Sequence, residues 1–213
     1  MRKEMGENDR ALFVDFDFHS GAVGFRLRLR ERGNLAHALA GGSHLDDHWF
    51  NYPAQWNDLD VLPAPVSDAE IRKGSLLNVE ALFNCFKAHY PVTAVDMPTA
   101  FYSSCRDIAT LADLTVLFCT PQVLSLHLAK RRLSDMFRIG VRPEAMQIIL
   151  NRADATAPVE VDYVQEVLEV KVIGRRPNDY QAVNNAYLMG GLVSETSDLG
   201  AALSGLSRYL LDL

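Results

Sequence analysis

The chain has 213 residues, of which 48% are hydrophobic and 23% charged, and its formal net charge is −6. These values predict an ordinary soluble globular protein and argue against non-specific nucleic-acid binding by the whole surface. No apolar stretch approaches the roughly 20 residues of a membrane span, and the charged N-terminus does not have the apolar core of a signal peptide. We therefore expect a cytoplasmic protein with reduced cysteines.

The first predicted element is a buried strand over Ala11–Asp15, which ends in a pair of aspartates. Asp15 closes the strand, and Asp17 follows it before the small-residue turn at 19–21. In open α/β sheets the carboxyl ends of the strands are where ligands bind. Two carboxylates at such a place cost desolvation energy unless a metal ion, a water molecule or a hydrogen-bond donor compensates. This strand end is therefore the first candidate site.

Further apolar runs alternate with helical patterns along the rest of the chain, and most of them lack polar alternation. Such runs are typical of parallel strands that are covered on both faces. The predicted strands are Ala11–Asp15, Leu59–Pro63, Val92–Asp96, Leu114–Cys119, Met146–Leu150 and Val170–Gly174. Apolar stripes at helical spacing run over 76–86, 126–137 with Gly140 as a C-cap, 161–168, 180–187 ended by Gly190, and 199–210 with Thr196 or Ser197 as the N-cap.

This alternation predicts an α/β fold, with a mostly parallel sheet flanked by helices on both faces, as a single domain over residues 1–213. Residues 41–65 form the least regular part and are expected to be a long surface connection. Parallel strands bring their carboxyl ends to one edge of a sheet. We therefore expect Asp15, Asp17, Asp96 and Asn151 to converge there, and three neighbouring carboxylates favour Mg²⁺.

Five short motifs in this order resemble the ParA/MinD-type ATPases of the P-loop class, and most closely their CpaE/TadZ branch of pilus-assembly proteins. The motifs are a D-x-D strand end with a small-residue turn (13–21), a D-x-P strand end (95–98), a threonine-proline turn before a long helix (116–121), an L-N-R strand end (150–152) and P-N-D-Y before a helix (177–183). The resemblance covers about residues 11 to 211.

The resemblance implies a role for each matching residue. Asp17 would orient or polarise the water that attacks the γ-phosphate of ATP, Asp15 would help at the metal ion, and Asp96 would hold Mg²⁺ through water. The adenine side of the site is implied to involve Asn151, Arg152, Pro177 and Asp179.

One departure from the family is large. The family begins with a strand, a glycine-rich loop with lysines and a helix, and the backbone N–H groups and lysine charge of that loop grip the phosphates. Neither G-x-x-x-x-G-K-[ST] nor the family's lysine-glycine-glycine variant occurs in these residues, and the glycine cluster at 41–43 has no lysine. Residues 1–8 resemble the tail of the helix that follows the loop. We therefore expect the first strand, which is central in the family's sheet, to be missing and to leave a gap.

Two functions follow as expectations. The first is a Mg²⁺-dependent ATPase that forms a homodimer and that assembles or positions a Flp/type IV-like pilus or secretion system through protein partners. The second is a degenerate or truncated relative that keeps the fold as a protein-interaction scaffold. The missing loop argues against ATP binding and favours the second function for catalysis. No specific nucleic-acid partner is expected.

Two other groups of residues carry weaker signals. His44 and His48 have a spacing that can bind zinc on a helix, but nothing else in the chain supports a metal centre there. The alternating segment Phe25–Arg30 could meet a phosphate or an acidic partner, and its simpler interpretation is a solvated basic surface.

Overall fold

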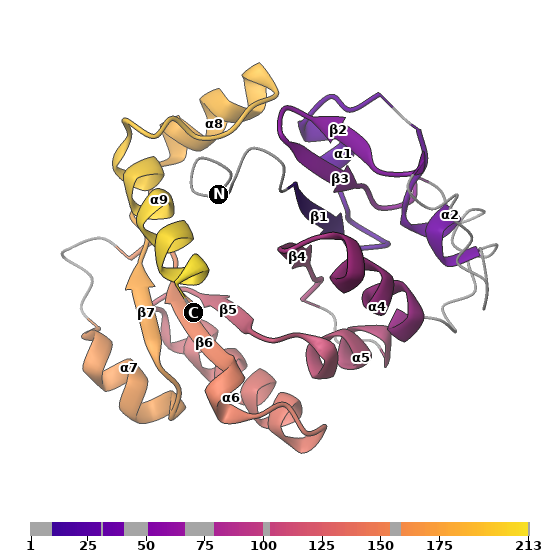
Figure 1. Cartoon of the computed structure of the whole chain (residues 1–213). Helices are drawn as coiled ribbons and strands as arrows, with labels where there is room; N and C mark the ends of the chain where they lie inside the picture. Colours follow the sequence, from indigo (N-terminus) through magenta and orange to yellow (C-terminus); the bar gives the residue numbers. More distant parts are fainter. Residues whose placement is uncertain are drawn as a thin grey trace. The chain divides into compact units, whose positions relative to one another are not determined.

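The computed structural model describes residues 10–30, 32–40, 51–66, 79–99, 103–153 and 159–212. The chain divides into two compact units between Leu111 and Ala112 (Figure 1). Both units contain parallel strands flanked by helices, so the predicted α/β fold class is confirmed. The single domain over residues 1–213 stays a prediction. Among the described residues, no helix combines the length and the apolar character that crossing a membrane requires.

The N-terminal unit contains a four-stranded sheet in the order β2-β3-β1-β4. Strand β1 is central, pairs in parallel with β3 and β4, and is apolar on both faces, as its sequence predicts. The elements are β1 (Ala11–Asp15), α1 (Val23–Arg26), α2 (Leu35–Ala40), β2 (Ala54–Trp56), β3 (Leu59–Leu62), α4 (Val79–His89), β4 (Thr93–Asp96) and α5 (Ser103–Leu111). The core packs Leu12, Val14 and Phe16 against Leu82 and Phe86 of α4.

The C-terminal unit contains a three-stranded parallel sheet in the order β5-β6-β7. Every residue of the central strand β6 is buried, and α6 covers the sheet with Leu126, Ala129 and Leu133. The elements are β5 (Thr115–Cys119), α6 (Val123–Arg138), a 3₁₀ turn (Pro143–Ala145), β6 (Met146–Leu150), α7 (Val161–Leu168), β7 (Val172–Arg175), α8 (Tyr180–Met189) and α9 (Asp198–Leu211).

The predicted strands agree with the structure to within two residues, and the predicted helical stripes lie within α4, α6, α7, α8 and α9, apart from residues 76–78, which lie outside the described residues. Gly190 ends α8 in a left-handed conformation with φ +66°, and Ser197 rather than Thr196 caps α9 by accepting a hydrogen bond from the Gly200 N–H. The structure adds β2, a short antiparallel strand inside the segment that the sequence assigned to a loop. Gly41, Gly42 and the candidate zinc histidines lie outside the described residues.

The strands form two sheets instead of the one sheet that the sequence predicts. Strand β4 is the last strand of the first sheet and β5 is the first strand of the second, and the two are not paired with each other. The crossover β4–α5–β5 therefore joins two strands that each lie at the edge of a sheet.

Candidate functional site

The carboxyl ends of β1 and β4 lie side by side and bring two aspartates together. Asp15 and Asp96 are register partners in the parallel ladder, and the Phe16 N–H donates to the Asp96 backbone carbonyl at 2.9 Å. Asp15 is 1% exposed, whereas Asp96 is exposed. The structure thus brings together two of the predicted site residues, one of them buried and one accessible to solvent.

The loop after β1 is organised by its own aspartates. Asp17 Oδ1 accepts hydrogen bonds from the backbone N–H groups of His19 at 3.2 Å and Ser20 at 2.9 Å. Asp15 accepts from the Asp17 N–H at 3.3 Å with Oδ1 and from the Val23 N–H at 3.1 Å with Oδ2. The buried carboxylate is therefore compensated by backbone donors, and it also fixes the position of α1 relative to β1.

Gly21 allows this loop to close against the end of β3. A Cβ atom at Gly21 would lie 2.9 Å from Asp15 Oδ1 and would collide with the side chain of Ala64 and the carbonyl of Asp17. The Gly21 N–H also donates to that carbonyl at 2.8 Å. The turn at 19–21 therefore needs a glycine at its last position because no side chain fits there.

Crowding of negative charge shapes the electrostatics of this edge. Burial raises the pKa of Asp15, and the backbone hydrogen bonds, of which the Val23 bond is the strongest, counteract the increase. Partial desolvation raises the pKa of Asp96, the charges of Asp15 and Asp17 raise it further, and Arg26 of α1 lowers it. A bound cation would relieve the same repulsion that raises these pKa values.

The donor set suits a metal ion that takes only part of its ligands from protein. Among the described residues, no hydrogen bond to the Asp96 carboxylate is found, so its oxygens are available. The same residues contain no group of three or more Asp, Glu, His or Cys side chains placed to hold a metal ion. Mg²⁺ commonly uses one or two protein carboxylates and completes its octahedron with water and phosphate oxygens. Asp96 suits such a partial site, with the charge of the buried Asp15 behind it, and the expected three-carboxylate set is not formed among the described residues.

The remaining predicted residues lie in the C-terminal unit, at the carboxyl ends of β6 and β7. A tight turn follows β6, in which Asn151 Oδ1 accepts from the Arg152 N–H at 3.0 Å and Arg152 has φ +52°. The turn is closed by backbone bonds from Arg176 to the Leu150 carbonyl (2.8 Å) and from Ala153 to the Arg176 carbonyl (2.9 Å). Asn151 and Arg152 thus lie next to the end of β7. Whether they converge with Asp15 and Asp96 stays a prediction.

Arg175, the last residue of β7, and the following Arg176 have no acidic partner among the described residues. Arg176 is 6% exposed, donates from Nη1 to the Arg175 carbonyl at 2.7 Å, and has no partner for its buried Nε. Burial lowers the pKa of its guanidinium group. Arg175 donates from Nη2 to the Val159 carbonyl at 2.7 Å, and its Nε is also buried without a partner.

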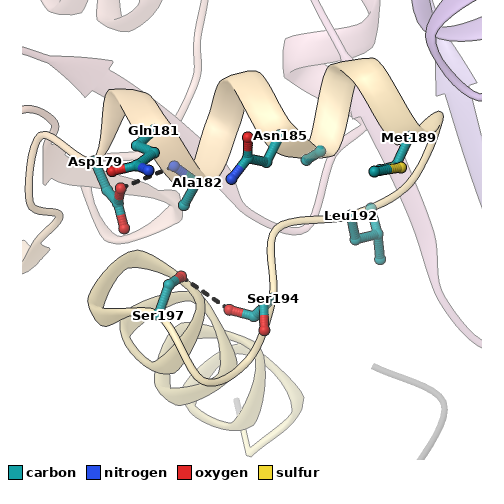
Figure 2. Close-up of a pocket in the computed structure, with 9 residues that line it drawn as sticks. Asp179, Gln181, Ala182, Asn185, Met189, Leu192, Ser194 and Ser197 are labelled. Atoms are coloured by element: carbon teal, nitrogen blue, oxygen red, sulfur yellow. Dashed lines mark hydrogen bonds between the residues drawn. The ribbon is translucent and has the colours of Figure 1, made fainter.

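Asp179 has a structural role in addition to any functional one. It caps α8 by accepting from the Ala182 N–H at 2.9 Å, and the preceding Pro177 is half-buried (Figure 2). Asp179 also lines an open hollow of about 430 Å³ between α8 and the segment before α9. Gln181 and Asn185 supply amide groups to this hollow, and Met189 and Leu192 close its apolar end.

Sequence reasoning missed three contributors to the acidic edge. Val23 donates its N–H to Asp15, Ala64 limits the space at the turn, and Arg26 acts on Asp96. The alternation of Arg and Leu after Phe25 marked Arg26 only as a basic surface. The segment is one short helix turn that ends at Arg26, followed by Arg28 with φ +51°.

No family model and no curated protein sequence matches the chain. Its structure is similar to a ParA family ATPase from Chlorobium tepidum TLS, with a TM-score of 0.82 and 21% identity over 92% of this chain and 85% of that chain. It is also similar to the septum site-determining protein MinD of Pyrococcus horikoshii OT3 complexed with Mg-ADP, with a TM-score of 0.75 and 20% identity over 90% of this chain and 79% of that chain.

A third similar structure is the MinC:MinD cell division protein complex of Aquifex aeolicus, with a TM-score of 0.73 and 19% identity over 97% of this chain and 85% of that chain. At these identities the likeness establishes the fold. This chain has the fold of the ParA and MinD ATPases.

Proposed function

We propose that this chain is a ParA/MinD-type protein of the CpaE/TadZ branch, which takes part in assembling or positioning a Flp/type IV-like pilus or secretion system in the cytoplasm. The fold supports the ParA/MinD part of the proposal. The observation that carries it is the pairing of Asp15 with Asp96 at the carboxyl edge of a parallel sheet in that fold. The P-N-D-Y segment before α8 supports the CpaE/TadZ branch.

In this proposal the acidic edge handles the metal ion and the attacking water. Asp96, which is exposed and lacks a hydrogen-bond donor among the described residues, holds Mg²⁺ through water, and Asp15 adds negative charge behind it. Asp17 orients the water with the carboxylate oxygen that its loop leaves unused. Bound Mg²⁺ neutralises phosphate charge during ATP hydrolysis.

The strand ends of the C-terminal unit form the adenine side of the proposed site. Asn151 and Arg152 lie in the turn after β6, and Pro177 and Asp179 lie between β7 and α8. The L-N-R and P-N-D-Y matches support this assignment. Because Asp179 also caps α8, a test of its role at the adenine needs a variant that keeps the helix cap.

Calorimetric titration with Mg²⁺ and the non-hydrolysable analogue AMPPNP tests the nucleotide site. Because no lysine-bearing glycine loop occurs in the 213 residues, we expect no binding tighter than millimolar. Micromolar affinity would show that the loop is not required.

If the natural chain binds the nucleotide with micromolar affinity, Asp96→Asn should weaken binding only when Mg²⁺ is present. Asp179→Ser, which retains a capping oxygen, should weaken it with helix stability unchanged, and unchanged affinity in both variants would overturn the residue assignment.

A non-catalytic scaffold is the second candidate, and the absence of the loop motif from the sequence favours it. Deletion of the gene in its host, followed by counting of surface pili or secreted substrate, tests the cellular role. Complementation with Asp96→Asn then separates the two candidates. Restored assembly supports the scaffold and lost assembly supports the ATPase, whereas normal assembly in the deletion strain would refute both.

A further inference from the structure

A run of exposed arginines begins in α1 of the N-terminal unit. It reads Phe-Arg-Leu-Arg-Leu-Arg-Glu-Arg over residues 25–32, and we name it the arginine segment. Phe25 is 89% exposed and all four arginines are exposed, whereas the two leucines are half-buried. Among the described residues, no ion pair is found for Arg30 or Arg32. Glu31, the single acid of the segment, lies outside the described residues.

Close packing holds both ends of the arginine segment on the β2–β3 side of the first sheet, whose opposite edge is β4. A Cβ atom at Gly24 would lie 3.2 Å from the Cβ atom of Pro63, directly after β3. A Cβ atom at Gly33 would lie 2.5 Å from the ring of Tyr52, shortly before β2. The Leu29 N–H also donates to the Gly24 carbonyl at 3.0 Å, which folds the segment back at the end of α1. The backbone of the segment is therefore ordered before a partner arrives, which lowers the entropy cost of binding.

The positive charge of the arginine segment is local. The chain has a net charge of −6 and the segment contributes four arginines and one glutamate, so all other residues together carry −9. The acidic edge comes just before the segment, because the Val23 N–H at the start of α1 donates to the Asp15 carboxylate. A nucleic acid or an anionic membrane would meet this negative charge as well, whereas a short acidic stretch of polypeptide can contact the segment alone. Charge complementarity therefore favours a short acidic polypeptide as the partner.

We propose that the arginine segment binds a short acidic stretch of a partner polypeptide. Arg30 and Arg32 pair with its carboxylates, for which the planar guanidinium group supplies parallel N–H donors. Phe25 packs against an apolar side chain of the same stretch, and this contact is needed because exposed ion pairs alone contribute little free energy. These three residues have no role in the proposed nucleotide site, so the binding does not depend on the proposed function.

Fluorescence anisotropy of the full chain with a labelled Glu-Glu-Leu-Glu-Glu peptide tests this binding. We expect a Kd below about 1 mM at low salt, and we expect it to rise about fivefold at 0.2 M salt because exposed charges are screened. The double variant Arg30→Gln/Arg32→Gln should raise the Kd about fivefold, and Phe25→Ala should raise it about threefold. The matched control is Lys130→Gln/Arg131→Gln, which removes two exposed positive charges from α6 and should leave the Kd unchanged.

Three further probes define the class of partner. A Gln-Gln-Leu-Gln-Gln peptide should not bind, and a short single-stranded DNA and vesicles that contain phosphatidylserine should bind more weakly than the acidic peptide. Tighter binding of the DNA or the vesicles, if the arginine double variant abolishes it, would overturn the proposal in favour of that polyanion. The proposal is also overturned if the acidic peptide does not bind, if the glutamine peptide binds equally well, or if the arginine double variant and the α6 control have the same Kd.

Discussion

Two groups of strand ends in this molecule hold opposite charge and satisfy it in different ways. At β1 and β4 the carboxylates of Asp15 and Asp17 accept backbone N–H groups from the loop that they precede. At β7 the guanidinium groups of Arg175 and Arg176 bond to backbone carbonyls, and each keeps a buried nitrogen without a partner. Backbone N–H groups of the loop therefore satisfy the carboxylates of Asp15 and Asp17, whereas Arg175 and Arg176 each keep one N–H donor without an acceptor.

This difference indicates what each region could accept from a ligand. The acidic edge gains most from a cation, since desolvation raises the pKa values of Asp15 and Asp96 and the negative charge of Asp17 raises both further. The basic end gains most from an acceptor or an anion, because buried donors without partners cost free energy.

Substitution at Gly21 tests whether the acidic edge depends on its scaffold, and it has the largest expected effect. Gly21→Ala forces a methyl group against Ala64 and the Asp17 carbonyl and should lower the free energy of unfolding by about 2 kcal/mol in urea titrations. Gly205→Ala in α9 is the matched control, since a Cβ there meets no atom within 4 Å. It should stabilise the protein by about 1 kcal/mol. Equal effects in the two variants would contradict the close packing at Gly21.

The sequence predicted the strands of this edge well, because β1 and β4 are apolar runs that end in aspartates. It could not predict the return of the chain to the strand end. That return depends on the close contact between Gly21 and Ala64, which are far apart in sequence. It also depends on the N–H of Val23, which is a backbone donor. Sequence patterns report which faces are buried, whereas a backbone donor has no residue type that marks it.

The sheet topology was predictable only in part for a related reason. Strands β5, β6 and β7 follow from apolar runs, but β2 is a strand of three residues with one buried position, so its sequence pattern is weak. The strands divide into two sheets because β4 and β5 are not paired with each other, and no residue pattern within either strand specifies whether they pair. In the sequence, Arg175 and Arg176 look like a solvated basic pair. The burial of Arg176 becomes visible only in the structure.

Substitution of the two arginines tests the basic end, with intermediate effects of opposite sign. Arg176→Met removes a buried charge that has no acidic partner among the described residues, and it should raise the free energy of unfolding by about 1 kcal/mol. Arg175→Met removes the donor to the Val159 carbonyl and should lower it by about 1 kcal/mol. Chemical denaturation of both variants at pH 7 provides the measurement. Destabilisation by Arg176→Met would mean that the guanidinium is better satisfied than its contacts indicate.

Asp96→Asn tests the smallest expected effect, the repulsion within the acidic edge. The folded protein raises the pKa of Asp96 above its ordinary value of 3.8, so the charged form destabilises the fold at neutral pH. That destabilisation disappears as the pH falls through the folded pKa toward the unfolded value. The variant should therefore be more stable than the natural chain at pH 7, by about 0.5 kcal/mol because Asp96 is exposed, and the difference should vanish below pH 3.8.

Thermal unfolding across this pH range, with and without Mg²⁺, gives the result. The exposed Glu166→Gln on α7 controls for the change in net charge, and it should shift stability equally little at both pH extremes. Mg²⁺ should stabilise the natural chain more than the Asp96 variant, because the cation relieves the repulsion that asparagine has already removed. A stabilisation of Asp96→Asn that persists in acid would place its cause in packing, and the acidic edge would then have no charge repulsion for a cation to relieve.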